Sequence, residues 1–190
     1  MQTADLGETD MALVRRAQAG DEAAFGRLVE RYMRRAYLAA LSLVGSREDA
    51  LDLSQEAFAR AYRSRDAIDP ERPFYAWLYQ ILRRLCFNFL RDRKTHARAL
   101  AQAGSWLADD AADRAAPDPA EALERQERRR VVAAAIEALP DREREVLALR
   151  EFEDLSYKEI AALVGVPIGT VMSRLYAARK RLVQALEVNR

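Results

Sequence analysis

Residues 155–186 read LSYKEIAALVGVPIGTVMSRLYAARKRLVQAL, and this stretch decides the fold of the C-terminal part of the chain. Ser156 and Glu159 form a capping box, in which the serine hydroxyl accepts the Glu159 amide, so a helix begins there. Gly165 stands where a left-handed residue would end that helix, and Pro167 can open the next one. The spacing predicts a helix-turn-helix, whose second helix can enter the major groove of DNA.

The second helix of this unit is predicted to bury Val171 and Leu175 and to expose its polar residues. Residues 169–190 hold five basic side chains against one acidic side chain. A charged face that is merely solvated is the competing interpretation, but the caps and the basic excess favour DNA binding. Arginine near the helix start suits guanine, and the later cations suit phosphates. The expected DNA contacts are Thr170, Met172, Ser173, Arg174, Tyr176, Arg179 and Lys180.

The first half of the chain is also helical by the spacing of its apolar residues. One helix begins after the cap Asp21, a second covers residues 46–62 and has an acidic outer face, and a third covers 74–94. Two prolines and three acids in residues 64–73 predict a loop before the third helix. The expected core stripe of that third helix is Phe74, Trp77, Leu78, Ile81, Leu85 and Phe89.

The fold class predicted from these patterns is all-α, with two small helical domains joined by a flexible linker. Residues 95–120 are rich in Ala and Asp, contain two prolines and lack an apolar stripe, which favours a linker with a short helical turn around Trp106. The predicted domains are residues 1–94 and 121–190. In the second of them, Asp141 is expected to cap a helix.

Composition narrows the possible functions. The 190 residues carry 31 basic and 30 acidic side chains, so binding to nucleic acid must depend on local charge, such as the nine basic and four acidic residues of segment 60–94. Cys86 is the only cysteine, and with His96 it cannot form a zinc site that needs four protein ligands. No nucleotide-binding glycine loop and no pair of nucleophile and base stands out either, so we expect no metal, no cofactor and no catalytic residues. We expect Cys86 to fill the core and His96 to be solvated. No apolar run is long enough to span a membrane, so no membrane insertion and a cytoplasmic location are expected.

Three segments resemble one protein family. Residues 139–182, from LPDREREV to ARKRL, resemble the promoter-binding C-terminal domain of sigma factors, although response regulators carry a similar helix-turn-helix. Residues 48–68, EDALDLSQEAFARAYRSRDAI, resemble the sigma segment that docks on RNA polymerase. Residues 73–94, PFYAWLYQILRRLCFNFLRDRK, resemble the adjoining promoter-melting helix. The order matches too, so the chain resembles the compact extracytoplasmic-function sigma factors of the sigma-70 family.

This resemblance implies a non-enzymatic factor that directs promoter recognition, DNA melting and transcription initiation. The implied partners are core RNA polymerase, at the coiled-coil of its largest subunit and at its flap regions, promoter DNA and an anti-sigma factor. The implied polymerase-binding residues are Asp49, Asp52, Leu53, Gln55, Glu56 and Phe58, with Leu53 and Phe58 supporting the acidic face.

The third helix would hold the melted promoter strand, and the 64–73 loop would read a flipped base. Aromatic rings can stack on splayed bases while cations hold the backbone. The implied contacts are Tyr75, Tyr79, Arg83, Arg84, Asn88 and Arg91. Tyr75 and Tyr79 are expected to be exposed, whereas Trp77 is expected in the core.

Two other functions stay open at this point. A stand-alone helix-turn-helix regulator would bind an operator without docking on polymerase, and footprinting with and without the core enzyme would separate it from a sigma factor. A helical adaptor that binds no DNA would show no dependence of its binding on ionic strength.

Overall fold

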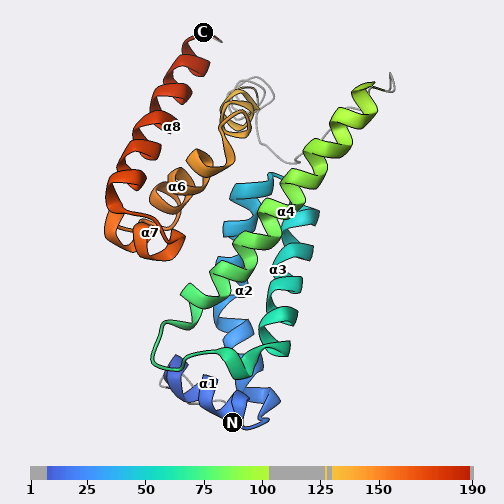
Figure 1. The fold of residues 1–190 in the computed structure, drawn as a ribbon, viewed down its shortest axis with the longest axis vertical. Coiled ribbons are helices and arrows are strands. Elements are labelled where there is room, and N and C mark those ends of the chain that lie inside the picture. The colour runs from blue at the N-terminus through green and yellow to red at the C-terminus, as the bar shows by residue number, and fades with distance from the viewer. Residues whose placement is uncertain (1–7, 103–126, 128–129, 189–190) are drawn as a thin grey trace, which may run out of the picture. The chain divides into compact units, whose positions relative to one another are not determined.

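The computed structural model describes residues 8–102, 127 and 130–188, and all the regular elements in these ranges are helices (Figure 1). This architecture confirms the predicted all-α fold class. Contacts between residues divide the chain into two compact units, residues 1–91 and 92–190.

The first unit is built from helices that begin at the polar caps expected from sequence. Asp21 accepts the Ala24 amide at 3.1 Å, and Ser46 accepts the Asp49 amide at 3.3 Å. Gly45 adopts a left-handed conformation, with φ of 79°, and ends the helix that begins at Glu22. The elements are α1 (Asp10–Gln18), α2 (Glu22–Val44), α3 (Arg47–Arg63), the 3-10 turn η1 (Arg65–Ala67) and α4 (Phe74–Gln102), which continues beyond the unit.

Aromatic rings form the core that joins α2, α3 and α4. Phe25 of α2 lies edge-on to Tyr62 of α3 with ring centroids 5.1 Å apart, and Tyr32 of α2 stacks on Tyr75 of α4 at 5.7 Å. The Tyr32 hydroxyl donates to Asp10 of α1. Burial and then this hydrogen bond raise the pKa of Tyr32 to about 12, so the phenol stays protonated and keeps α1 attached to α2.

Helix α4 is longer than predicted, because it continues past residue 94, where the third helix was expected to end. The helix continues to Gln102 because residues 94–102, KTHARALAQ, contain no Pro or Gly and include several strong helix formers. The rest of the predicted linker, with Trp106, lies outside the described residues. Cys86 is fully buried on α4, as predicted, and His96 is exposed but helical.

The second unit contains α6 (Asp141–Glu151), α7 (Tyr157–Val164) and α8 (Ile168–Val188), and residues 130–137 are helical as well. The prediction that Asp141 caps a helix is wrong. Pro140 occupies the cap position and offers only its backbone carbonyl, while Asp141 is the first helical residue. The Asp141 carboxylate instead accepts from Arg144 at 3.0 Å, one turn along the same helix.

The predicted helix-turn-helix is confirmed in α7 and α8. The Ser156 hydroxyl accepts the Glu159 amide at 3.3 Å, and the Glu159 carboxylate accepts the Ser156 amide at 2.8 Å. Gly165 follows in the left-handed region with φ of 73°, and the axes of α7 and α8 then differ by 105°. None of the helices in the described ranges could cross a membrane alone by length and hydropathy, although the bent α7–α8 pair passes that test as a pair.

Substitution of Gly165 by Ala should destabilise the second unit by about 1–2 kcal/mol, the cost of a left-handed L-residue. A Cβ at Gly165 would meet nothing within 4 Å, so backbone strain is the whole effect. The same open space surrounds Gly169, which is helical, so Gly169→Ala is the matched control and should stabilise α8 by up to about 1 kcal/mol. Native-state hydrogen exchange of the α7–α8 amides measures the stability change in both variants. Equal changes would contradict the assignment of the cost to backbone strain at Gly165.

Candidate nucleic-acid interface

Helix α8 has one apolar side and one polar side. Val171, Leu175 and Ala178 recur at helical spacing and are buried against the rest of the unit, because they pack toward α6 and α7. The side chains that follow each of them are exposed, with Met172 at 53% and Tyr176 at 71% of their accessible surface. Of the predicted DNA contacts, the exposed ones are Met172, Ser173, Tyr176, Arg179 and Lys180.

Arg174 is less exposed than predicted. Its side chain is partly buried, and its Nη1 is buried without a hydrogen-bond partner among the residues that the structure describes. A buried guanidinium nitrogen without an acceptor is unfavourable. If the Arg174 side chain rotated away from the helix toward the edge of a DNA base, this nitrogen would gain a hydrogen-bond acceptor. Thr170, one turn earlier on α8, is also partly buried.

Two cations of α8 are held by acids of α6. Arg179 donates to Glu151 at 2.9 Å, and this hydrogen bond raises the pKa of the Arg179 guanidinium. Arg181 lies 3.1 Å from the carboxylate of Glu143. Glu143 is mostly buried, whereas the pair of Arg179 and Glu151 is about half exposed. The ion pair of Arg181 with Glu143 therefore holds α8 against α6. Arg179 can exchange the Glu151 carboxylate for a phosphate at low cost, because its ion pair is solvated.

The predicted exposure of Tyr75 and Tyr79 on α4 is wrong. Their exposed fractions are 4% and 1%, because both phenols lie in the core of the first unit, where Tyr75 also carries the Arg35 guanidinium 3.7 Å above its ring. The buried stripe of α4 is rotated relative to the predicted one, so that Ile81 and Phe89 are only partly buried. The buried side chains are Phe74, Tyr75, Leu78, Tyr79, Leu82, Leu85, Cys86 and Leu90.

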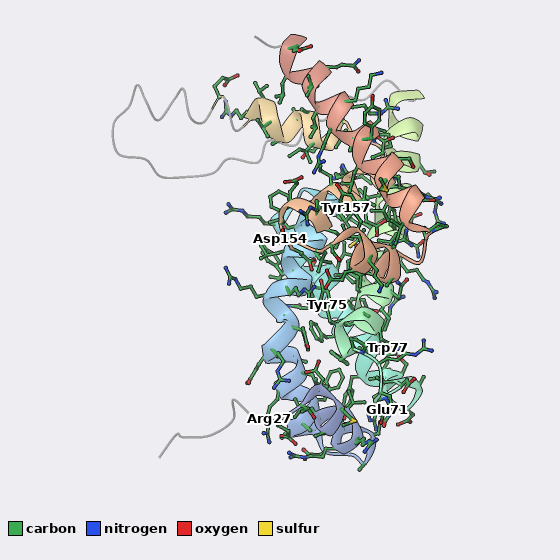
Figure 2. All side chains as sticks on the ribbon, turned by 90° about the vertical axis from the view of Figure 1, so that its left-hand side faces the viewer. Arg27, Glu71, Tyr75, Trp77, Asp154 and Tyr157 are labelled. Carbon is green, nitrogen blue, oxygen red and sulfur yellow. The ribbon has the colours of Figure 1, made fainter. Side chains whose placement is uncertain are left out.

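Trp77, labelled in Figure 2, is instead only partly buried on α4. Trp77, Arg84 and Asn88 are separated by seven and four residues, which places them on one side of a helix, and Arg91 continues the stripe. Arg84, Asn88 and Arg91 are exposed, and Trp77 is partly exposed. The spacing of Trp77 from these polar residues is visible in the sequence, but an apolar stripe with Phe74, Leu78 and Ile81 competes with it.

Arg83 lies beside this outer stripe and has a different environment. Its guanidinium carbon is 4.8 Å from the centroid of the Phe87 ring, one turn further along α4. The side chain is partly buried by this contact. A cation stacked on an aromatic face keeps its charge, so Arg83 can still attract a phosphate.

The acidic face of α3 contains an exposed leucine that the sequence analysis missed. Leu51 is 45% exposed and lies between Glu48 and Gln55 on the side that also carries Asp52. Asp49, Leu53 and Glu56 are partly buried at the edge of this face. An apolar side chain surrounded by acids fits a partner that offers both cations and an apolar contact.

Phe58 and Glu56 take internal roles on α3. Phe58 is buried, which agrees with the supporting role expected for it. Glu56 accepts from Arg60 at 2.7 Å and from Arg63 at 3.1 Å. The hydrogen bond from Arg60 is the main reason that the pKa of Glu56 is lowered. Its charge is thus partly neutralised within the helix, whereas Asp52 is exposed on the open side.

Both units match models of one protein family. Residues 28–96 match sigma-70 region 2, and residues 129–182 match sigma-70 region 4. The RNA polymerase sigma-H factor of Pseudomonas aeruginosa is 36% identical over 183 residues, which cover 95% of each chain. The chain belongs to the sigma-70 family. Among its relatives of the extracytoplasmic-function type, the sigma-E factor of Escherichia coli is 36% identical over 177 residues, 92% of each chain.

Two solved structures resemble this one over most of the chain. CnrH, solved in complex with the cytosolic domain of CnrY, gives a TM-score of 0.69 at 27% identity and covers 96% of this chain and 100% of its own. The sigma factor RpoE of Bartonella quintana, solved with the anti-sigma factor NepR, gives 0.66 at 26% identity, with 87% and 98% covered. The sigma-70 assignment therefore includes the fold as well as the sequence.

The region 2 match of this sigma factor contains the stripe of α4 and the acidic face of α3, and the region 4 match contains most of α8. The exposed residues identified above thus lie inside the segments that define the family. The predicted boundaries at residues 94 and 121 stay predictions, since the matches end at 96 and begin at 129.

The two aromatic assignments on α4 can be separated by stability. Tyr79→Ala should lower the free energy of unfolding by about 3–5 kcal/mol, because it removes a fully buried ring. Trp77→Ala should cost less, about 1–2 kcal/mol, because its ring is already partly in water. Urea unfolding followed by circular dichroism measures both.

Tyr176→Ala is the matched control for loss of a tyrosine ring, since Tyr176 is exposed, and it should change stability by less than about 0.5 kcal/mol. A cost for Trp77→Ala as large as that for Tyr79→Ala would show that Trp77 belongs to the core and not to the outer stripe of α4.

Proposed function

We propose that this sigma factor binds core RNA polymerase through α3, places α8 in the upstream promoter element and holds melted DNA on α4. The observation that carries the proposal is the segregation of exposed side chains by chemistry within matched family regions. An acidic face with a central leucine lies on α3, a tryptophan in line with cations lies on α4, and a basic face lies on the second helix of a helix-turn-helix.

On α8, the exposed side chains suit duplex DNA. Ser173 and Arg174 lie near the start of the helix, where groove-binding helices touch base edges, and Arg174 is suited to guanine. Arg179 and Lys180 lie two turns later, where side chains meet phosphates and fix the register. Met172 and Tyr176 add apolar surface that can contact a thymine methyl group.

On α4, Trp77 would stack on a base of the opened strand while Arg84 and Arg91 bind its phosphates. Asn88 lies between these arginines and can hydrogen-bond to a base edge. The 64–73 loop, which leads into α4, would read a base that has left the stack. Tyr75 and Tyr79 support this surface from inside and do not contact DNA in the proposal.

On α3, Asp52 and its acidic neighbours would face the basic coiled-coil of the largest polymerase subunit, with Leu51 in the desolvated centre. The second unit would contact the flap regions. Catalysis belongs to the polymerase in this mechanism, and the site of action is the cytoplasm. Because CnrH and RpoE were solved with CnrY and NepR, we include an anti-sigma factor among the partners.

Two features support a sigma factor over the other functions considered. A stand-alone regulator requires only the helix-turn-helix, whereas this chain also matches region 2 over residues 28–96. An adaptor that binds no DNA has no use for cations gathered on the outer face of α8. The single DNA-binding surface of a stand-alone regulator would also leave the stripe on α4 unexplained.

Run-off transcription with purified core polymerase tests the proposal. Arg174→Ala should weaken discrimination at one position of the upstream element by roughly 10–100-fold, because a base contact is worth about 1–3 kcal/mol. Asp52→Ala should weaken core binding by roughly tenfold and leave promoter preference unchanged, because it removes one charge from a complementary surface.

The matched controls are Arg142→Ala, an exposed arginine outside α8, and Glu30→Ala, an exposed acid outside α3. Both should behave as the wild type. The proposal fails if the wild-type protein gives core polymerase no preference among promoters, or if it binds an operator equally well without the polymerase.

A further inference from the structure

Gln18, the last residue of α1, binds the 64–73 loop that connects α3 to α4. Its side-chain amide donates to the backbone carbonyl of Arg65 at 3.0 Å and to that of Ile68 at 2.8 Å. The two acceptors lie at the beginning and just beyond the end of η1. One amide group therefore fixes both ends of this turn, from a position 47 and 50 residues earlier in the chain.

The loop also binds back to α1. Arg65 donates from Nε to the carbonyl of Ala17 at 3.2 Å and from Nη1 to the carbonyl of Tyr62 at 3.1 Å. Its guanidinium carbon lies 4.7 Å from the centroid of the Tyr62 ring. The Ala17 carbonyl also accepts the Gly20 amide at 3.1 Å, so Arg65 adds a second donor at the end of α1. Gln18 and Arg65 together form a reciprocal clamp between α1 and the loop.

The clamp orders the first part of the loop, ahead of the exposed residues that lead into α4. Ile68, which follows η1, is buried, whereas Asp69, Glu71 and Arg72 are exposed. Phe74 then begins α4 in the core. These exposed residues are thus held at both ends, by the clamp and by the start of α4. A shift of either end would move them.

We propose that Gln18 is a positioning residue for promoter recognition, which sets the base preference of the 64–73 loop through its two hydrogen bonds to backbone carbonyls. This inference rests on the function proposed above, in which the loop reads the melted strand. Gln18 itself touches no DNA. It acts on the shape of the loop, and the clamp is independent of the loop's exposed side chains because both acceptors of Gln18 are backbone atoms.

The test compares base preferences of reconstituted holoenzymes. Core polymerase with wild-type protein or Gln18→Met transcribes a promoter library randomised over the melted element and the upstream element, and the transcripts are sequenced. Methionine keeps the length and helix propensity of glutamine but donates no hydrogen bond. We expect the wild-type preference at one or two melted positions, roughly tenfold or more, to fall to about twofold in the variant.

The upstream preference, which depends on α8, and the affinity for core polymerase should stay unchanged in Gln18→Met. A merely structural role would lower total transcription and leave the base preferences as they are, and that result would overturn the inference. Gln184→Met, the same substitution at an exposed site on α8 outside the proposed DNA contacts, is the control. Arg15→Ala, which removes only an exposed ion pair with Glu71, should also leave the preferences unchanged.

Arg65→Met breaks the clamp from the other side and should relax the same positions, so it carries the test if Gln18→Met does not fold. Absence of promoter preference with the wild-type protein would defeat the proposed function. Retention of the wild-type preferences by both clamp variants, with an active wild type, would defeat this inference alone.

Discussion

The packing of aromatic rings between α2, α3 and α4 is the interaction on which the first unit depends. Tyr32 and Phe25 on α2 meet Tyr75 and Phe74 on α4, and these contacts fix the rotation of α4 about its own axis. A helix turned by one residue, about 100°, would bury its arginines. The outward direction of Trp77 and the cations is therefore a consequence of the rings that fill the opposite side.

In the second unit, buried side chains also fix the rotation of the helix that carries the exposed residues, but these side chains are smaller. Gly165 allows the chain to turn sharply after α7, and the 105° angle between α7 and α8 leaves the outer side of α8 uncovered within the unit. Val171 and Leu175 then decide which side that is. In both units, buried core residues determine which side chains of α4 and α8 are exposed to a ligand.

Local signals in the sequence predicted the helices well but predicted the rotation of α4 poorly. Caps such as Asp21 and Ser156 act over three residues, so their effect is visible in the chain itself. On α4 two apolar stripes compete, one through Trp77 and one through Tyr79, and periodicity alone cannot choose between them. Tyr75 and Tyr79 lie off the stripe through Trp77 and were therefore expected to be exposed, but contacts with neighbouring side chains bury them. The hydrogen bonds of Gln18 could not be predicted from the sequence either, because every residue has the same backbone carbonyl acceptor.

The ion pair of Arg179 with Glu151 affects how binding would respond to salt. When a protein cation neutralises a phosphate, it displaces a condensed counterion from the DNA, and this release makes affinity fall as salt concentration rises. Arg179 would first have to leave Glu151. Salt also screens this ion pair, so breaking it costs less as the salt concentration rises, and the contact makes affinity less dependent on salt than a contact from an unpaired cation would.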